Sequence, residues 1–165
     1  MHIVNTNYKT KITPIDIKKV HGNIKHSKLY VGKPNMLKIK KYNACLLLFR
    51  SGSIRIMGRE NHDKLLQKVI SKIPNVKQLI PLELMSHTVV HQINSLVNLH
   101  ILDPYKFFSN QELFPAVIYR HNSNEHANIF ASGKIVITGS KSINNVKQLI
   151  INIEKDLENG CYTRY

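Results

Sequence analysis

The stretch LFRSGSIRIMG at residues 48–58 returns as IFASGKIVITG at residues 129–139. The matched pairs lie 81 positions apart (130 minus 49) and include Phe49 with Phe130, Gly52 with Gly133, Pro34 with Pro115 and Asn43 with Asn124. We expect the match to extend without a gap. Because a solenoid needs three or more short units to bury a continuous core, two long copies instead predict one domain with two-fold pseudo-symmetry.

Charge is the most informative feature of the composition. The chain has 165 residues, about the length of one domain, with 24 Lys and Arg against 10 Asp and Glu and a net charge of +14. Such an excess favours a polyanionic partner, of which nucleic acid is the most common. The alternative is a basic surface that serves only solubility.

The sequence disfavours several classes of protein. Cys45 and Cys161 are too few for a disulfide scaffold. The pair His87 and His91 lacks a glutamate between them and a third ligand, which disfavours a metal site, and the scattered acidic residues indicate no enzyme. No segment has the length and apolarity of a membrane span or the apolar core of a signal peptide, so we expect a soluble intracellular protein without cofactors.

Each copy changes from strand to helix periodicity along its length. Residues 37–49 and 116–130 each predict two strands around a polar turn, and the Ser-Gly pair that follows leads into a third antiparallel strand. Apolar residues at helical spacing come next. They are Leu65, Val69 and Ile73 in the first copy, and Val146, Leu149, Ile150, Ile153 and Leu157 in the second.

Alternation sorts the strand residues into two faces. The core face is predicted to carry Leu46, Leu48, Ile54 and Ile56, and Ala127, Ile129, Ile135 and Ile137. The opposite face carries Leu47, Phe49, Arg55 and Met57, and Asn128, Phe130, Val136 and Thr138. Apolar side chains exposed beside basic ones indicate a binding surface, and the DNA minor groove is a suitable target. The alternative is that a loop or a second copy of the chain covers this face.

The segments ELFPAVIYR (112–120) and IFASGKIVITGSK (129–141) closely resemble the second repeat of the TATA-box-binding protein family. IVNT (3–6) and PIDIKKV (14–20) resemble the opening strand and helix of its first repeat, and Met85 to Phe114 can be laid on its inter-repeat strand and helices. The resemblance implies an α+β saddle, with two repeats, 1–78 and 79–165, forming one curved antiparallel sheet. Helices would cover its convex face, and the concave face would lie on DNA.

The resemblance also assigns roles to single residues. Phe114 and Phe130 resemble the pair of phenylalanines that kink DNA, and Val136 and Thr138 resemble contacts to the groove floor. Arg120, Lys134 and Lys141 resemble residues that face the DNA backbone. In the first repeat Phe49 matches one wedge and Leu47 a groove contact, while Arg55 and Met57 stand in place of groove-contacting Val and Thr.

The chain departs from the family pattern at several positions. Lys33 occupies the place of the fourth phenylalanine, His2 and Glu83 replace two asparagines, Ser53 replaces a lysine and Asn128 replaces a leucine. The carboxylate of Glu83 cannot donate to acceptors on the groove floor, and it repels phosphate unless it is protonated or paired. These departures weaken the expectation of strict TATA preference more than that of binding and bending.

The resemblance implies a general transcription initiation factor that bends AT-rich promoter DNA. Its partners would be a protein like initiation factor B, contacted through Glu112, and the RNA polymerase machinery. The alternative is an adaptor of the same fold, or a non-specific nucleic-acid-binding module. The composition, rich in Lys, Ile and Asn, and the size of the departures suggest a large DNA virus or a fast-evolving parasite as the source. The expected place of action is the nucleus, or a cytoplasmic viral transcription site if the source is viral.

Overall fold

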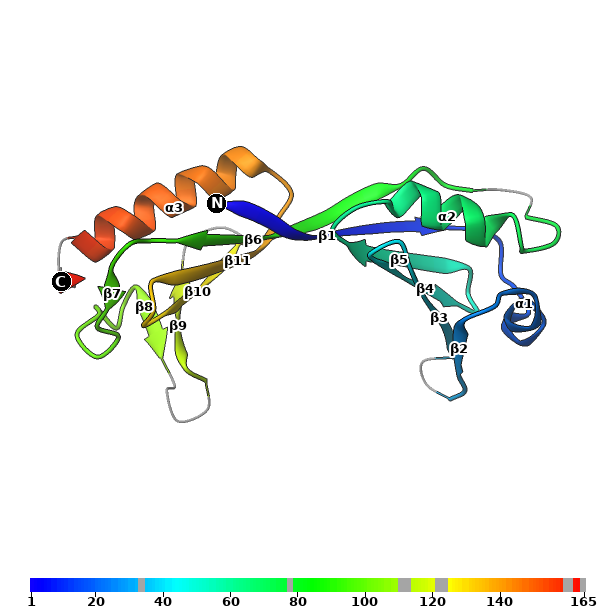
Figure 1. The fold of residues 1–165 in the computed structure, drawn as a ribbon, viewed down its shortest axis with the longest axis horizontal. Helices are drawn as coiled ribbons and strands as arrows, with labels where there is room; N and C mark the ends of the chain where they lie inside the picture. Colours follow the sequence, from blue (N-terminus) through cyan, green and yellow to red (C-terminus); the bar gives the residue numbers. More distant parts are fainter. Residues whose placement is uncertain (33–34, 77–78, 110–113, 121–124, 159–161, 164–165) are drawn as a thin grey trace. The chain divides into compact units, whose positions relative to one another are not determined.

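The computed structural model describes residues 1–32, 35–76, 79–109, 114–120, 125–158 and 162–163 (Figure 1). The chain divides into two compact units. The first unit comprises Asn5–Met85, and the second comprises Ser86–Tyr165 together with Met1–Val4. Both units combine helices with antiparallel strands, which makes the fold class α+β.

In the first unit the strand order is β2-β3-β4-β5-β1, and all neighbouring strands are antiparallel. The strands are β1 (His2–Lys11), β2 (Ser27–Tyr30), β3 (Met36–Lys41), β4 (Ala44–Phe49) and β5 (Ser53–Gly58). The helices are α1 (Ile17–Asn23) and α2 (His62–Ile70). The predicted three-stranded meander corresponds to β3, β4 and β5 and is confirmed.

In the second unit the strand order is β6-β11-β10-β9-β8, again antiparallel. The strands are β6 (Glu83–Gln92), β8 (Phe107–Ser109), β9 (Ala116–Arg120), β10 (His126–Phe130) and β11 (Lys134–Ser140). Helix α3 (Ile143–Glu158) follows the meander, and β7 (Leu96–Val97) pairs separately with β12 (Tyr162–Thr163). The predicted meander and helix of the second copy are therefore confirmed.

The duplicated Ser-Gly turns have a steric cause. Gly52 and Gly133 have φ angles of 83° and 78°, a region that L-amino acids with a side chain rarely occupy. A Cβ atom on Gly52 would lie 2.1 Å from the carbonyl oxygen of Ile12, and one on Gly133 would lie 2.3 Å from that of Ser95. Glycine is therefore required in both turns, because each turn packs directly against another part of the backbone.

Each unit has its own core between the sheet and a helix. The eight strand residues predicted for the core face are all buried in the two clusters. Helix α2 lies against β4 and β5 in the first unit, and α3 lies against β11 in the second (Figure 1). The predicted helix residues are buried too, but α2 ends at Ile70, so Ile73 lies in the following turn. Pro74 comes next, and a residue before proline is disfavoured in a helix.

The connection after β6 differs from the prediction. The resemblance placed helices in the segment from Met85 to Phe114, but its described residues 93–106 form turns and β7, without a helix. This part of the prediction is wrong. Leu102 and Phe107 nevertheless reach the core of the second unit, so turns bury the apolar side chains that a helix would otherwise carry.

The repeat is also not free of gaps. In the first unit Leu46 pairs with Ile39, seven residues earlier, whereas in the second unit Ala127 pairs with Tyr119, eight residues earlier. The β3–β4 turn has only two residues, Tyr42 and Asn43, between the last pair of the two strands. Their φ angles of 56° and 58° are those of a tight type I′ hairpin turn. The connection in the second unit is longer, so β3 and β9 match at an offset of 80 (116 minus 36).

This offset changes which residue of the first unit corresponds to Phe114, the position at which the sequence predicted Lys33 in place of a phenylalanine. Phe114 lies two residues before β9, and the residue two positions before β3 is Pro34 rather than Lys33. Lys33 and Pro34 both lie outside the described residues. The predicted equivalence of Lys33 with Phe114 therefore does not agree with the strand pairing.

The Asp156 carboxylate links α3 to other parts of the second unit. Asp156 accepts hydrogen bonds from the Tyr119 hydroxyl at 2.6 Å and the Lys106 ammonium at 2.7 Å. Burial acts to raise the pKa of Asp156, but the hydrogen bonds from Lys106 and Tyr119 outweigh burial and leave this pKa below its usual value. The group therefore stabilises the fold above about pH 4, and this contribution is lost as the pH falls through the lowered pKa.

We expect Asp156→Asn to lower the free energy of unfolding by about 1–3 kcal/mol at neutral pH, because it removes a charged acceptor from two partners. Urea denaturation measures the difference, which should shrink below about pH 4. Glu158→Gln, on the same helix but exposed, is the matched control and should change little. An equal loss in both variants would contradict the anchoring role of Asp156.

Candidate nucleic-acid interface

The sheet side opposite the helix-covered core is called the open face of each unit. In the second unit it carries two phenylalanines in contact. The ring centroids of Phe114 and Phe130 are 6.0 Å apart, with an interplanar angle of 64°. Phe114 is 42% exposed and Phe130 is half-buried. The structure thus brings together the two residues predicted to form a wedge, and neither belongs to the core.

Strand register shows which side chains lie beside one another on this face, because residues directly opposite in an antiparallel pair share a face. The central cross-strand row of the second unit runs through Phe108, Ile118, Asn128, Val136 and Val90. A neighbouring row includes Thr138, which lies between His126 and Thr88. The central row has no charged residue and presents a largely apolar surface.

Sequence reasoning missed Phe108, Ile118 and Val90. Each follows a buried residue of the same strand, namely Phe107, Val117 and Val89. Alternation within KFFS, AVIYR and TVVHQ is the signal that could have identified them. Phe108 is the most exposed of the three, at 48%, and it extends the apolar surface to the edge strand.

The corresponding row of the first unit is strongly basic. It runs through Lys38, Leu47, Arg55 and Lys9. Arg55 and Lys9 are exposed, and Leu47 is half-buried. The next row runs through Lys40, Cys45, Met57 and Asn7. The predicted residues Leu47, Arg55 and Met57 therefore share one face, but lysines flank the Leu47–Arg55 pair, and Met57 lies between Cys45 and Asn7.

Phe49 lies on the same open face and is half-buried, with Met36 opposite on β3. Within the described residues no ring contact of Phe49 is present. The two open faces therefore differ in aromatic content as well as in charge.

Glu83 has a partner that the sequence did not reveal. Its carboxylate lies 3.0 Å from the Lys9 ammonium, and the two side chains are 52% and 48% exposed. An ion pair this exposed contributes little to stability and weakens with salt. It does offset the negative charge of Glu83, which reduces the repulsion of phosphate expected from an unpaired carboxylate.

Strand β1 adds amide groups that were not predicted. Asn5 and Asn7 alternate with buried Thr6, and the Asn5 amide donates to the Asn7 side-chain oxygen at 3.5 Å. Asn7 lies opposite Met57 on the open face. Amide N–H groups can donate to the adenine N3 and thymine O2 acceptors of a minor groove. The alternation NTNYKTK was the available signal.

The remaining predicted residues lie toward the ends of strands. Lys134 begins β11 and is exposed, and Lys141, one residue beyond β11, is exposed as well. Arg120 ends β9 opposite His126, but the structure does not describe its side chain. Glu112 lies outside the described residues, so its predicted contact with a protein partner stays a prediction.

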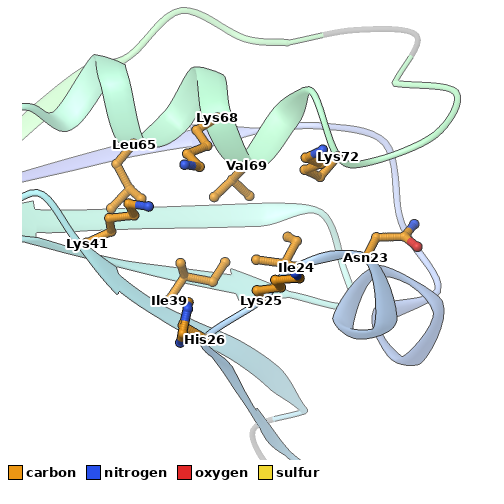
Figure 2. A pocket seen from close by; sticks show the side chains of 10 residues that line it. All are labelled: Asn23, Ile24, Lys25, His26, Ile39, Lys41, Leu65, Lys68, Val69 and Lys72. Carbon is orange, nitrogen blue, oxygen red and sulfur yellow. The ribbon is translucent and has the colours of Figure 1, made fainter.

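Basic residues also gather on the helix side of the first unit. A cavity of about 290 Å³ has apolar side chains between four lysines (Figure 2). It is lined by Ile24, Ile39, Leu65 and Val69, by Lys25, Lys41, Lys68 and Lys72, and by Asn23 and His26. A hydrogen-bonding interaction with Lys68 and its like charge lower the pKa of Lys41. Net charge alone therefore does not identify the open face as the DNA surface.

The structure gives no support for a metal site. His87 and His91 lie on strand β6, and His91 Nε2 is 2.9 Å from Glu154 Oε1 on α3. The part of the chain that the structure describes contains no group of three or more His, Cys, Asp or Glu residues that could hold a metal ion. Nor does a described helix have the length and apolarity needed to cross a membrane.

Comparisons with known proteins agree with this geometry. The family model described as transcription factor TFIID, or TATA-binding protein (TBP), matches residues 90–159. The TATA-box-binding protein of Picrophilus torridus is 27% identical over 134 residues, which cover 73% of this chain and 72% of that protein. The protein of that name from Sulfolobus acidocaldarius is 31% identical over 126 residues, covering 70% and 64%.

Over a shorter region the identity to a relative is higher. TATA-box-binding protein 3 of Methanosarcina mazei is 47% identical over 53 residues, which cover 32% of this chain and 29% of that protein. Among solved structures, Methanococcus jannaschii TBP matches with a TM-score of 0.78 and 24% identity, covering 95% of this chain and 97% of that one. The last match establishes the fold. The sequence matches are to TATA-box-binding proteins and, with this fold, they support a divergent TBP-family protein.

Proposed function

We propose that this chain is a transcription initiation factor that binds promoter DNA in the minor groove through its open faces and bends it. The observation that carries the proposal is the contact between Phe114 and Phe130 on the open face of the second unit. Two partly exposed rings beside an uncharged row of side chains form a surface suited to a widened groove. The proposed partners of the complex are a protein like initiation factor B, with Glu112 as a contact, and the RNA polymerase machinery.

The physical basis is a balance between unstacking and apolar contact. Opening a base step costs a few kcal/mol, and an inserted apolar side chain offsets this cost by filling the gap. Proteins of this fold are known for such insertion, so bending itself is a family expectation. What is specific to this chain is that the ring pair, Phe114 and Phe130, lies in the second unit.

We expect binding to weaken steeply with salt, because neutralising phosphates with lysine and arginine releases counterions. Fluorescence anisotropy with a duplex of about 20 base pairs, between about 50 and 200 mM salt, measures this slope. Lys134→Ala should reduce the slope of the logarithm of the binding constant against the logarithm of the salt concentration by about one, the value for one lost phosphate contact. A flat response would contradict contact between the basic residues and the phosphates.

Bending is tested separately by fluorescence energy transfer between the duplex ends. We expect a larger transfer change with duplexes rich in TA steps than with GC-rich duplexes, because TA steps are flexible and the minor groove of A·T pairs lacks the guanine amino group. Binding without bending would instead support a non-specific nucleic-acid module. An absence of duplex binding at low salt would support the adaptor alternative.

A further inference from the structure

We infer that the two open faces bind different forms of the minor groove, with Arg55 holding a narrow, A-tract groove against the first unit while the second unit holds a widened one. The inference rests on the proposed function, because it assumes that both faces contact duplex DNA. It identifies Arg55 as a residue that determines sequence preference.

The position of Arg55 supports this assignment. Arg55 lies between Leu47 on β4 and Lys9 on β1, and Lys38 lies beyond Leu47. Neighbouring strands are about 4.8 Å apart, so three cations lie in one row across four strands. Of these, Lys9 is paired with Glu83. Within the described residues Arg55 has no ion pair with a carboxylate, so its charge is available to an external anion.

The chemistry of the side chain selects the form of the groove. A-tracts have a narrow minor groove with an enhanced negative potential that attracts arginine. The guanidinium group is weakly hydrated and carries several N–H donors, which suits the adenine N3 and thymine O2 acceptors on the groove floor. An exposed arginine on a sheet face therefore gains more from a narrow groove than from one that has been opened.

The second unit has an uncharged residue at the position that matches Arg55. Val136 occupies the place of Arg55, with Asn128 and Val90 as its strand neighbours. The adjacent wedge pair Phe114 and Phe130 requires an unstacked step. An uncharged row next to a wedge favours a widened groove, and a basic row without a ring pair favours a narrow one. A bound site would therefore have two unlike halves.

The test uses duplexes of equal base composition, with either an A-tract or alternating TATA steps in one half of the site. Competition binding gives the ratio of their dissociation constants. We expect the wild-type protein to prefer the A-tract duplex, and Arg55→Val to reduce this preference at least about fivefold, the lower end of what a specific groove contact provides. Arg55→Lys should retain part of it.

Two further observations separate the possible failures. Lys72→Val removes one charge from the helix side and should leave the A-tract preference unchanged. If the wild-type protein binds and bends duplex DNA but shows no A-tract preference, or if Arg55→Val leaves it intact, the role of Arg55 is overturned and the proposed function stands. If the wild-type protein binds no duplex at low salt, the proposed function fails as well.

Discussion

Ile137→Ala is expected to lower the free energy of unfolding by about 2–5 kcal/mol, the range for truncating a buried isoleucine. Ile137 is fully buried, and β11 pairs with strands on both sides, so Ala127 and Val89 lie directly opposite Ile137. Two neighbouring strands restrict the collapse of the sheet around the lost side chain, which leaves a cavity. Urea denaturation followed by circular dichroism measures the change.

Thr138 supplies the matched control, since it is the next residue of β11 and lies on the open face. We expect Thr138→Ala to change stability far less than Ile137→Ala, because no core cavity forms. Similar losses in the two variants would mean that the faces of β11 are assigned incorrectly. The assignment of Phe130 to the open face would then need revision too, because its strand pairs with β11.

Alternation was sufficient to predict the two cores. Leu46, Leu48, Ile54 and Ile56 alternate with residues of different character, and a shift of one residue would move all four into water. Their burial therefore follows from the sequence with little ambiguity. The Ser-Gly turns were visible as well, but only the structure shows that neighbouring backbone excludes a side chain at Gly52 and Gly133.

The neighbours across the open faces could not be predicted in the same way. Strand periodicity gives the face of Leu47 and Arg55, but it does not say that Lys38 and Lys9 lie beside them. That requires the register, which depends on turn length, and the tight turn between β3 and β4 shortens the first copy by one residue. The pairing of Glu83 with Lys9 was hidden for a related reason, because the two residues are far apart in the sequence and come together only through β1 and β6.

The role of the ring pair leads to the second large effect. We expect Phe114→Lys to abolish most of the DNA bend measured by fluorescence energy transfer. Phe114 is 42% exposed and touches Phe130 edge to face. Because Phe114 is not part of the core, its ring can enter a base step without disturbing the packing of the core. A lysine at this position would keep its ammonium group hydrated near phosphate, and the opened base step would lose the apolar contact that offsets unstacking.

Tyr105→Lys is the control for added charge and lost aromatic surface, because Tyr105 is 93% exposed in a turn outside the sheet. It should bind and bend DNA like the wild-type protein. Phe130→Ala should reduce the bend as well, with a smaller loss of stability than Ile137→Ala, because Phe130 is only half-buried. If Phe114→Lys and Phe130→Ala both bend DNA to the wild-type extent, these rings do not enter the duplex. The open face of the second unit would then bind DNA without a wedge, and the uncharged row through Val136 would have to account for any bending that remains.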